Sequence, residues 1–239
     1  VCRHGQRGWS LGMADPLLSV RGVTLAFGPK IIQHDLSFDV RRGNIFAIMG
    51  GSGCGKSTVL KSMIGLMRPS AGTILADGVD IWSGRGFGVL FQSGALWSAL
   101  TVGQNVALPL QMATTLNAAA IRRLVRLKLA MVDLEDAIDT APADLSGGMR
   151  KRAGLARALA LDPGILFFDE PSAGLDPITS RRMDDLILNL RDGLGTTIVL
   201  VSHELSSLFA IADDGVFLAE TPQGRAIPTT NHSLAYDLD

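Results

Sequence analysis

A glycine-rich run between a short apolar segment and a helical pattern carries the clearest chemistry in this sequence. Residues Gly50–Ser57 read GGSGCGKS, the spacing G-x-x-x-x-G-K-S, directly after the apolar run Ile45–Met49. Glycines allow successive backbone N–H groups to face an anion, and the helix N-terminus adds more N–H groups and its positive dipole end. Lys56 could reach the β- and γ-phosphates of a nucleotide, and the Ser57 hydroxyl could ligate Mg²⁺. In this context the motif predicts a nucleotide-phosphate site rather than an ordinary glycine-rich turn.

Two polar segments directly follow other apolar runs and suit the same chemistry. Asp169 and Glu170 come after the run ILFF, and His203 follows the run TIVLV with one serine between them. Ligands bind at the carboxyl edge of a doubly wound sheet, so we expect these residues beside the phosphate-binding loop. There Asp169 could hold Mg²⁺, Glu170 could deprotonate an attacking water, and His203 could donate a hydrogen bond to the γ-phosphate. Alone, a histidine is more often structural and a strand ending in Asp-Glu is common. Together with the phosphate-binding loop, His203 and the Asp169–Glu170 pair favour nucleotide hydrolysis.

A second glycine-rich turn, LSGGM at Leu145–Met149, opens a basic helical pattern. Ser146 with Gly147 and Gly148 at a helix start is another anion site made of a hydroxyl and backbone N–H groups. One nucleotide does not need two separate phosphate sites from one subunit, whereas a symmetric pair could use both, each copy covering the nucleotide of the other. A helix-capping turn is the alternative for LSGGM alone. The basic run Arg150–Arg152 predicts a solvated helix face.

The hydrophobic pattern predicts the elements that position these residues. Short apolar strands alternate with helical segments, which is typical of an α/β fold with a mainly parallel sheet covered on both faces. A period of two over the first segments predicts strands of an antiparallel flap. The predicted strands are Pro16–Phe27, Leu36–Val40, Ile45–Met49, Gly72–Asp77, Phe87–Phe91, Ile165–Phe168 and Thr197–Val201.

The segment 93–145 has a helical pattern. Thr101–Met112 begins with a threonine that suits an N-cap, and Pro109 should end or kink this helix. Asn117–Val132 begins with an asparagine that suits an N-cap. Its arginines and Lys128 lie among aliphatic residues, which predicts a solvated face opposite a packed one.

Length and composition exclude several classes of protein. A chain of 239 residues is long enough for one α/β domain with a sub-lobe, and a net charge of −1 gives no reason to expect nucleic-acid binding. The two cysteines are far apart, which favours a reducing cytoplasm over a disulfide framework. No apolar run approaches the roughly 18 residues of a membrane span, so a membrane role requires a partner. Residues 1–13 are expected to be disordered or non-native, and 223–239 are expected to form a weakly structured C-terminal tail.

The motifs GGSGCGKST, Gln92, LSGGM, ILFFDEP, SAGLD and VSHE, in that order, resemble the ATP-binding cassette of ABC transporters. The resemblance spans about Leu17 to Leu218. It implies an α/β P-loop NTPase (RecA-like) core, an N-terminal antiparallel β subdomain and a helical subdomain at about 93–157, all within a single domain over 14–222. It also implies ATP and Mg²⁺ as cofactors, a homodimer, and ATP hydrolysis that powers a separate integral-membrane permease.

The resemblance assigns roles residue by residue. It implies catalytic roles for Glu170, His203 and Lys56. It implies that Ser57, Gln92 and Asp169 ligate the metal ion. It implies that the family signature motif, Ser146, Gly147, Gly148 and Met149, acts in trans on the ATP of the other copy. It also implies that Asp176 lies at the dimer interface. The implied nucleotide-binding residues are Phe27, Gly50, Gly51, Ser52, Gly53, Cys54, Gly55, Lys56, Ser57, Thr58 and Gln92. By position alone, Phe27 could equally be a core strand residue or an aromatic that stacks on adenine.

Two segments are more specifically similar to the ATPases of Mla-type phospholipid transporters, which are also linked to solvent tolerance. They are FGVLFQSGALWSALTVGQNVALPL at 87–110 and LSGGMRKRAGLARALALDP at 145–163. The similarity implies a permease and an MCE-domain lipid-binding protein as partners, at the cytoplasmic face of a bacterial inner membrane. Trp97 would then be an exposed anchor for the permease, with ordinary lobe core as an equal alternative. Trp82–Phe87 and the C-terminus are shorter than is usual in the family, which affects the expected permease and dimer contacts rather than hydrolysis.

The sequence leaves three other functions open. A non-transport cassette ATPase acting on DNA or ribosomes would typically carry coiled-coil arms, a second cassette or a basic surface. A transporter ATPase for another solute would share every catalytic motif, because these motifs hydrolyse ATP whatever is carried. A regulatory nucleotide binder without a permease would lack robust ATPase activity.

Overall fold

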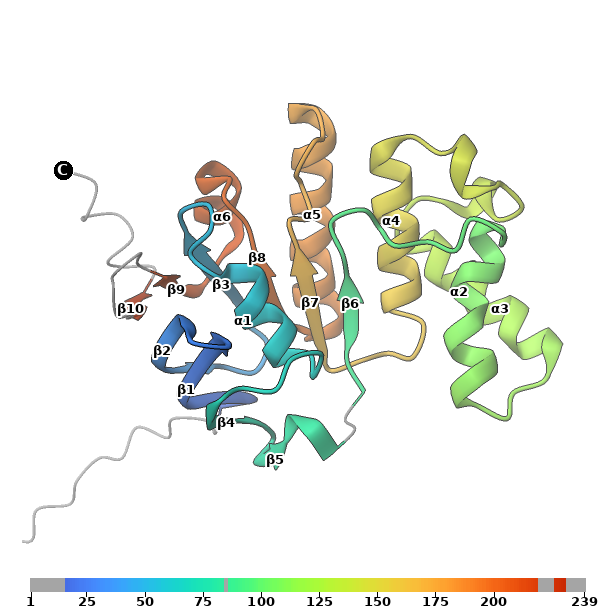
Figure 1. Cartoon of the computed structure of the whole chain (residues 1–239). Helices are drawn as coiled ribbons and strands as arrows, with labels where there is room; N and C mark the ends of the chain where they lie inside the picture. Colours follow the sequence, from blue (N-terminus) through green and yellow to red (C-terminus); the bar gives the residue numbers. More distant parts are fainter. Residues whose placement is uncertain (1–15, 84–85, 219–225, 231–239) are drawn as a thin grey trace, which may run out of the picture.

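A six-stranded sheet forms the centre of the computed structural model, which describes residues 16–83, 86–218 and 226–230 (Figure 1). Its strand order is β10-β9-β3-β8-β7-β6. Five of the strands run parallel to their neighbours, and only β10 is antiparallel, to β9. The strands are β3 (Ile45–Gly50), β6 (Gly88–Leu90), β7 (Ile165–Asp169), β8 (Thr197–Val201), β9 (Asp214–Leu218) and β10 (Ala226–Thr230). The predicted mainly parallel sheet is confirmed.

The central strands are apolar throughout because both of their faces are buried. Along β3, Phe46 and Ile48 point into one hydrophobic cluster, whereas Ile45, Ala47 and Met49 point into another. The first cluster joins this sheet to a second sheet, and the second cluster joins it to the helices. The molecule is therefore layered, with the parallel sheet in the middle.

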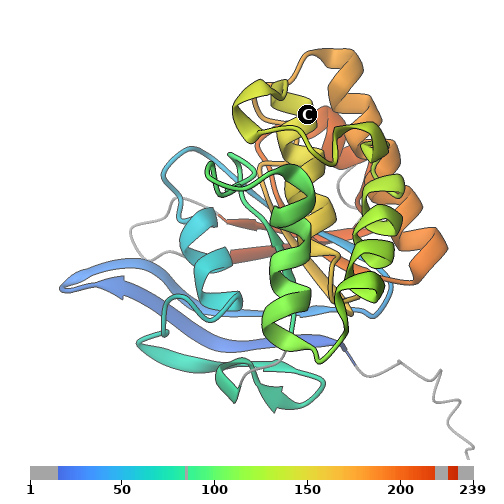
Figure 2. The same cartoon turned by 90° about the vertical axis from the view of Figure 1, so that its right-hand side faces the viewer.

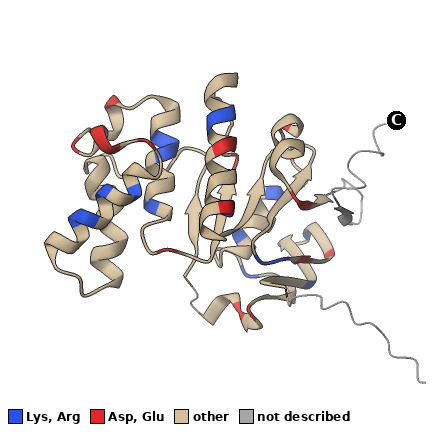
Figure 3. Ribbon diagram, turned by 180° about the vertical axis from the view of Figure 1, so that it is seen from behind, with Lys and Arg blue, Asp and Glu red and all other residues tan. Residues whose placement is uncertain are grey.

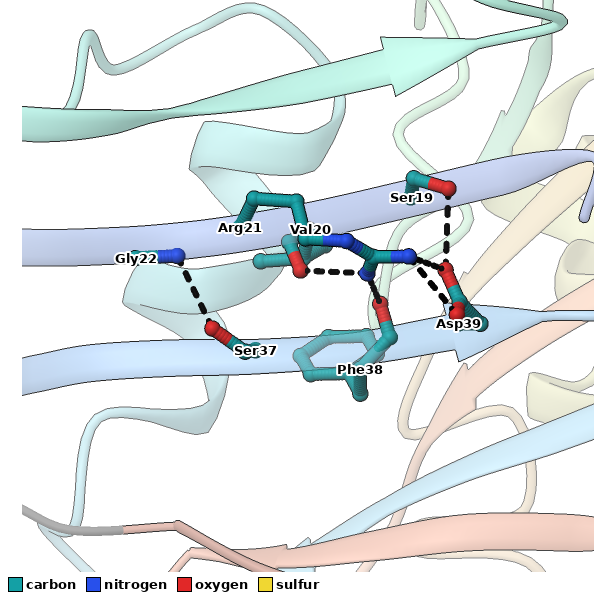
Figure 4. A network of polar contacts seen from close by, with 7 residues as sticks. All are labelled: Ser19, Val20, Arg21, Gly22, Ser37, Phe38 and Asp39. Atoms are coloured by element: carbon teal, nitrogen blue, oxygen red, sulfur yellow. Dashed lines mark hydrogen bonds and ion pairs between the residues drawn. The ribbon is translucent and has the colours of Figure 1, made fainter.

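The second sheet is antiparallel, with strand order β2-β1-β4-β5. Its strands are β1 (Leu18–Phe27), β2 (Lys30–Val40), β4 (Ala71–Ala76) and β5 (Val79–Asp80). Outward-facing polar residues join β1 to β2: Arg21 donates to both carboxylate oxygens of Asp39 at 2.6 and 2.7 Å, and Ser19 donates to Asp39 at 2.8 Å (Figure 4). The predicted antiparallel N-terminal flap is confirmed.

The helices divide into three groups. Helix α1 (Lys56–Met63) contributes Val59, Leu60 and Met63 to the cluster that joins the two sheets. Helices α5 (Pro177–Leu194) and α6 (Leu205–Ile211) cover the other face of the parallel sheet. Helices α2 (Val102–Ala113), α3 (Ala118–Ala130) and α4 (Gly147–Ala158) gather beyond the β6 edge (Figures 1 and 2). Short 3₁₀ turns occur at Ile81–Ser83, Glu135–Ala137 and Pro142–Asp144.

The N-caps of α2 and α3 follow the sequence prediction, whereas the role of Pro109 does not. Thr101 forms a complete capping box with Gln104, and Asn117 accepts from the backbone of Ala120 at 2.9 Å. Of the two effects expected of Pro109, an end or a kink, the end of α2 is wrong, because the helix continues to Ala113. The next residue, Leu110, is buried in the core, and this packing outweighs the hydrogen bond that a proline removes.

The predicted solvated faces of the basic residues are also wrong in part. Lys128 is buried and forms an ion pair with Asp162. In the run that follows the LSGGM turn, Lys151 is 5% exposed. Its neighbours Arg150 and Arg152 donate to backbone carbonyls, of Leu145 and of Val132 and Asp133. The two partly exposed arginines thus bind backbone carbonyls of the fold.

The structure contradicts the prediction for the C-terminal end and does not describe the residues of the prediction for the N-terminal end. Weak structure is expected over 223–239, but residues 226–230, the described part of this segment, form β10 in register with β9. The prediction for 1–13 lies outside the described residues. Within the described part of the chain, no helix is long and apolar enough to cross a membrane. Seen from behind, Lys and Arg are interspersed with Asp and Glu along the helices (Figure 3).

Candidate functional site

One cleft of about 880 Å³ brings together most of the residues that the motifs singled out. It lies at the carboxyl edge of the parallel sheet, where β3, β7 and β8 end. The predicted residues that line it are Gly50, Gly51, Ser52, Gly53, Gly55, Lys56, Ser57, Thr58, Gln92, Asp169, Glu170 and His203. Ser202, Leu205 and Phe217 also line it, and the sequence alone assigns no role to any of them.

The glycines of the phosphate-binding loop are required by its backbone. Gly50 has φ +147°, and a Cβ there would lie 2.6 Å from the carbonyl oxygen of Leu218. Gly55 has φ +99°, and a Cβ there would lie 2.5 Å from Cγ2 of Ile32. Gly55 is the N-cap of α1 and forms no side-chain cap, so the loop leads directly into the helix N-terminus. That arrangement directs the unpaired N–H groups of the first turn toward the cleft.

Lys56 lies folded against this loop. Its ammonium group donates to the carbonyl oxygens of Gly50 at 2.8 Å and Gly51 at 2.7 Å, and the residue is 9% exposed. The positive charge is thus held at the centre of the loop. Cys54 is different from its neighbours: it is buried beneath the loop, and its carbonyl accepts from Gln33 at 2.6 Å. Its side chain supports the loop and does not line the cleft.

Glu170 and His203 meet in the cleft. The Nδ1 atom of His203 lies 2.9 Å from Oε2 of Glu170, an ion-pair distance when the histidine is protonated. The Glu170 side chain is 13% exposed, whereas that of His203 is 63% exposed. Glu170 has φ +52°, and its N–H donates to the carbonyl of Val201 on β8 at 2.9 Å. The turn after β7 therefore holds this carboxylate at the cleft wall.

The donors needed for Mg²⁺ also lie in this cleft. Ser57, Gln92 and Asp169 offer a hydroxyl, an amide oxygen and a carboxylate. Burial raises the pKa of Asp169, and the nearby charge of Glu170 raises this pKa further, while Lys61 opposes the shift. Hard oxygen donors with one carboxylate fit Mg²⁺, which usually completes its shell with phosphates and water. Among the described residues, no group of three or more His, Cys, Asp and Glu side chains is arranged to hold a metal ion.

The LSGGM turn lies away from this cleft. Ser146, Gly148 and Met149 line a second cleft of about 880 Å³ with residues of α5. Ser146 caps α4 by accepting from the backbone of Met149 at 3.2 Å, which is the helix-capping alternative. A Cβ at Gly148 would lie 2.6 Å from Cγ2 of Thr179, so this glycine permits the close approach of α4 and α5. Within one chain, this turn and Lys56 belong to different surfaces.

Besides Cys54 and the LSGGM turn, three further predicted residues lie outside the main cleft lining. Phe27, at the end of β1, is 58% exposed. Asp176 caps α5 by accepting from the backbone of Ile178 and Thr179, and the Thr179 hydroxyl at 2.5 Å holds the pKa of Asp176 below its usual value. Trp97 is 63% exposed, so the core alternative is wrong for it.

The unanticipated cleft residues carried only weak sequence signals. Phe217 lies between the buried residues Val216 and Leu218 on β9, and this alternation could have indicated that it points away from the core. Ser202, the second residue of the VSHE motif, accepts from the backbone N–H of Glu204 at 3.0 Å, which is a local turn contact. Leu205 begins α6 directly after the loop that carries His203.

A family model described as ABC transporter matches residues 33–173. Among known proteins, the intermembrane phospholipid transport system ATP-binding protein MlaF of Haemophilus influenzae is 41% identical over 217 residues, 87% of this chain and 82% of its own length. MlaF of Escherichia coli K12 is 42% identical over 213 residues, 85% and 79% of the two lengths. The probable ribonucleotide transport ATP-binding protein mkl of Mycobacterium leprae is 41% identical over 206 residues, 82% of this chain. The alignment spans only 59% of that relative's length.

Solved structures of similar shape are also transporter cassettes. The structure of cbiO1 from Clostridium perfringens, part of the ABC transporter complex cbiONQ, has a TM-score of 0.84 and 28% identity, and covers 94% of this chain and 92% of its own. Two dimeric structures of the bacterial ABC transporter cassette MJ0796 each have a TM-score of 0.80 and 27% identity, covering 90% of this chain and 98% of theirs. One of these is a post-hydrolysis state bound to ADP and Pi.

Proposed function

This chain belongs to the ABC transporter family, and from that premise we propose that it is an ATPase that drives phospholipid transport through a separate permease. The observation that carries the ATPase part is the single cleft that joins the loop of Lys56 to Asp169, Glu170 and His203. The phospholipid part is supported by the similarity to MlaF proteins over most of both chains.

The loop Gly50–Thr58 would cradle the phosphates of ATP with its backbone N–H groups. Lys56 would exchange its contacts with the carbonyls of Gly50 and Gly51 for the β- and γ-phosphate oxygens. Such positioning and charge stabilisation supply most of the catalysis in phosphoryl transfer. Bound Mg²⁺ would neutralise charge between the two phosphates, and the residues that would hold it are Ser57, Gln92 and Asp169.

Glu170 would act as the general base and His203 as its partner. The Glu170 carboxylate at the cleft wall can accept a proton from a water aligned with the γ-phosphate. His203, 2.9 Å from that carboxylate and mostly exposed, is free to turn toward the γ-phosphate and donate to it. The pair would thus hold the water and the phosphate in one arrangement.

Two copies of the chain would form the complete enzyme. In each copy the turn Ser146–Met149 lies on a different surface from the loop of Lys56, and a two-fold pair can bring the turn of one copy to the ATP of the other. Asp176, an exposed N-cap near this surface, would lie at the interface. The dimeric structures of the similar cassette MJ0796 support such a pairing. ATP binding would close the pair and hydrolysis would open it.

The partners would be a permease and an MCE-domain lipid-binding protein, with the ATPase on the cytoplasmic face of a bacterial inner membrane. Trp97 supports this arrangement, because it is a large aromatic side chain exposed on the loop between Gln92 and α2. Exposed aromatic residues are frequent anchors of protein interfaces. Hydrogen bonds tie this loop to α2: buried Asn105 accepts from the N–H of Trp97 and donates to the carbonyls of Trp97, Leu100 and Thr101.

A second candidate is ATP-driven transport of ribonucleotides, favoured by the similarity to the probable ribonucleotide transport ATP-binding protein mkl of Mycobacterium leprae. Purification of the chain with its permease from detergent-solubilised membranes distinguishes the two candidate functions. Mass spectrometry should identify a permease and an MCE-domain protein, and ATPase activity of the complex should rise with phospholipid vesicles and not with ribonucleotides. Stimulation by ribonucleotides alone would instead support the second candidate.

A further inference from the structure

Lys151 is a buried cation that the proposed hydrolysis does not use. It lies on α4, five residues after Ser146, and is 5% exposed. Its ammonium group donates to the carbonyl oxygen of Glu170 at 3.0 Å and to that of Ala173 at 2.6 Å. The side chain therefore reaches from the helix that follows the LSGGM turn to the turn that carries the proposed general base.

The backbone of Glu170 needs such support. A φ of +52° is unfavourable for any residue with a Cβ and persists only where surrounding contacts impose it. On the N-terminal side, the N–H of Glu170 donates to Val201 at 2.9 Å. On the C-terminal side, the Glu170 carbonyl accepts from Lys151 and, at 3.3 Å, from the N–H of Ala173. Both peptide groups that flank Glu170 are thus held by named partners.

The charges around Lys151 agree with this geometry. Burial lowers the pKa of Lys151, and the negative charges of Glu204 and Glu170 oppose that shift. A buried ammonium group is tolerated when carbonyl oxygens and nearby carboxylates compensate its lost hydration. Glu204 directly follows His203, so the cation interacts with the carboxylate of Glu170 and with a carboxylate of the loop that carries His203.

We propose that Lys151 is a positioning residue for ATP hydrolysis. By holding the carbonyls of Glu170 and Ala173, it fixes the turn so that the Glu170 carboxylate points into the cleft. Lys151 does not line that cleft, so it acts through Glu170 and not on ATP. The inference rests on the proposed role of Glu170 as general base. Because Lys151 and Ser146 belong to the same helix, the contact also joins the LSGGM turn to the catalytic turn within one chain.

The test is the steady-state kinetics of Lys151→Met in the full chain, with Lys128→Met as the matched control. Both lysines are buried, but Lys128 pairs with Asp162, away from the cleft lining. Lys151→Met should lower kcat by about 10- to 100-fold, as expected when a catalytic group is misplaced. Its KM for ATP, and its affinity for a fluorescent ATP analogue, should stay within about threefold of the wild type, because ground-state binding is unaffected. Lys128→Met should keep the wild-type kcat.

Two further variants complete the test. Lys151→Arg keeps the charge and several donors, so it should recover most of kcat. If Lys151→Met is not recovered folded, Lys151→Gln replaces it: the shorter amide reaches one carbonyl, and kcat should fall at least about threefold with KM unchanged. A wild-type kcat in these variants, a rise in KM alone, or an equal loss in Lys128→Met would overturn the inference. A wild type that binds ATP without hydrolysing it would instead contradict the proposed function.

Discussion

At the scale of single residues, Glu170 shows how the fold places a reactive group. Residues held at positive φ cost about 1–3 kcal/mol each and concentrate where a side chain must point in one direction. Glu170 has φ +52°, contacts Val201 and Lys151 through its backbone, and has His203 within 2.9 Å of its carboxylate. A merely structural surface glutamate would not require this set of contacts.

Replacing Glu170 by glutamine is the direct test of its role. The amide has the same shape but cannot accept the proton of water, so turnover should fall by about 10²- to 10⁴-fold. Affinity for ATP should be retained, because the loop of Lys56 is unchanged. The measurement is phosphate release together with equilibrium binding of an ATP analogue. The exposed Glu135→Gln is the matched control and should hydrolyse ATP normally. Near-normal turnover in Glu170→Gln would remove Glu170 from the role of base.

The cleft residues that belong to motifs at the ends of strands could be predicted from the sequence. The residues whose positions depend on packing against distant segments could not. The loop around Lys56, the Asp169–Glu170 pair and His203 all follow apolar strands, and strands of one parallel sheet end at one edge. Lys151 was misassigned to a solvated face because its partners, the carbonyls of Glu170 and Ala173, come from a distant turn. Side chains that bind backbone carbonyls leave no pattern in the sequence.

At the scale of elements, the contact of α4 with α5 depends on one glycine. Gly148 lies in the first turn of α4, and a Cβ there would lie 2.6 Å from Cγ2 of Thr179. A Cβ at the neighbouring Gly147 would approach no atom closer than 3.9 Å, the distance to Cδ2 of Leu175. Two adjacent glycines of the same turn therefore differ in their packing.

This difference predicts opposite effects of the same substitution. Gly148→Ala should lower the free energy of unfolding by about 1–3 kcal/mol, because the methyl group forces the two helices apart. Gly147→Ala should leave it unchanged or raise it by up to about 1 kcal/mol, because alanine favours the helix. Urea denaturation of both variants measures the effect. Equal stability of the two would contradict the close packing at Gly148.

The junction of α5 and α6 makes stability depend on pH. Burial raises the pKa of Asp184, the charges of Glu204 and Asp185 raise it further, and the hydrogen bond from Ser207 at 2.6 Å opposes the shift. The folded state thus binds this proton more tightly than the unfolded state. Its contribution to stability is present at low pH and is lost as pH rises from the unfolded value of 3.8 through the raised folded pKa.

Asp184→Asn tests this directly. The amide keeps an acceptor for Ser207 but carries no charge, so the variant should gain stability relative to the wild type as pH rises through that range. At the acidic end of the pH series, the stability difference between Asp184→Asn and the wild type should be smallest. Denaturant midpoints measured over a pH series give the difference, and a difference independent of pH would contradict a raised pKa at Asp184.

Elements whose ends carry local signals were predicted well. Helix α1 begins at Lys56 and α3 follows the Asn117 cap as the sequence indicates, because caps and glycine turns act locally. Helix α2 differs in one respect: an end at Pro109 was one of two expected effects, whereas the helix continues to Ala113 with Leu110 buried in the core.

At the scale of the whole molecule, the two clefts define the central claim. The cleft around Lys56 and the cleft around Ser146 share no lining residue, yet the proposed reaction needs both groups at one ATP. In the proposed two-fold pair, a second copy of the chain would supply the missing side. Catalysis and dimerisation should therefore be inseparable.

The mass of Glu170→Gln in solution tests this claim most directly, because this variant should hold ATP without consuming it. Light scattering should give the single-chain mass of 25.3 kDa without nucleotide and twice that value with ATP and Mg²⁺. Ser146→Arg introduced into the same variant should abolish the doubling while leaving ATP bound. A mass that stays at 25.3 kDa with ATP demonstrably bound would contradict the account.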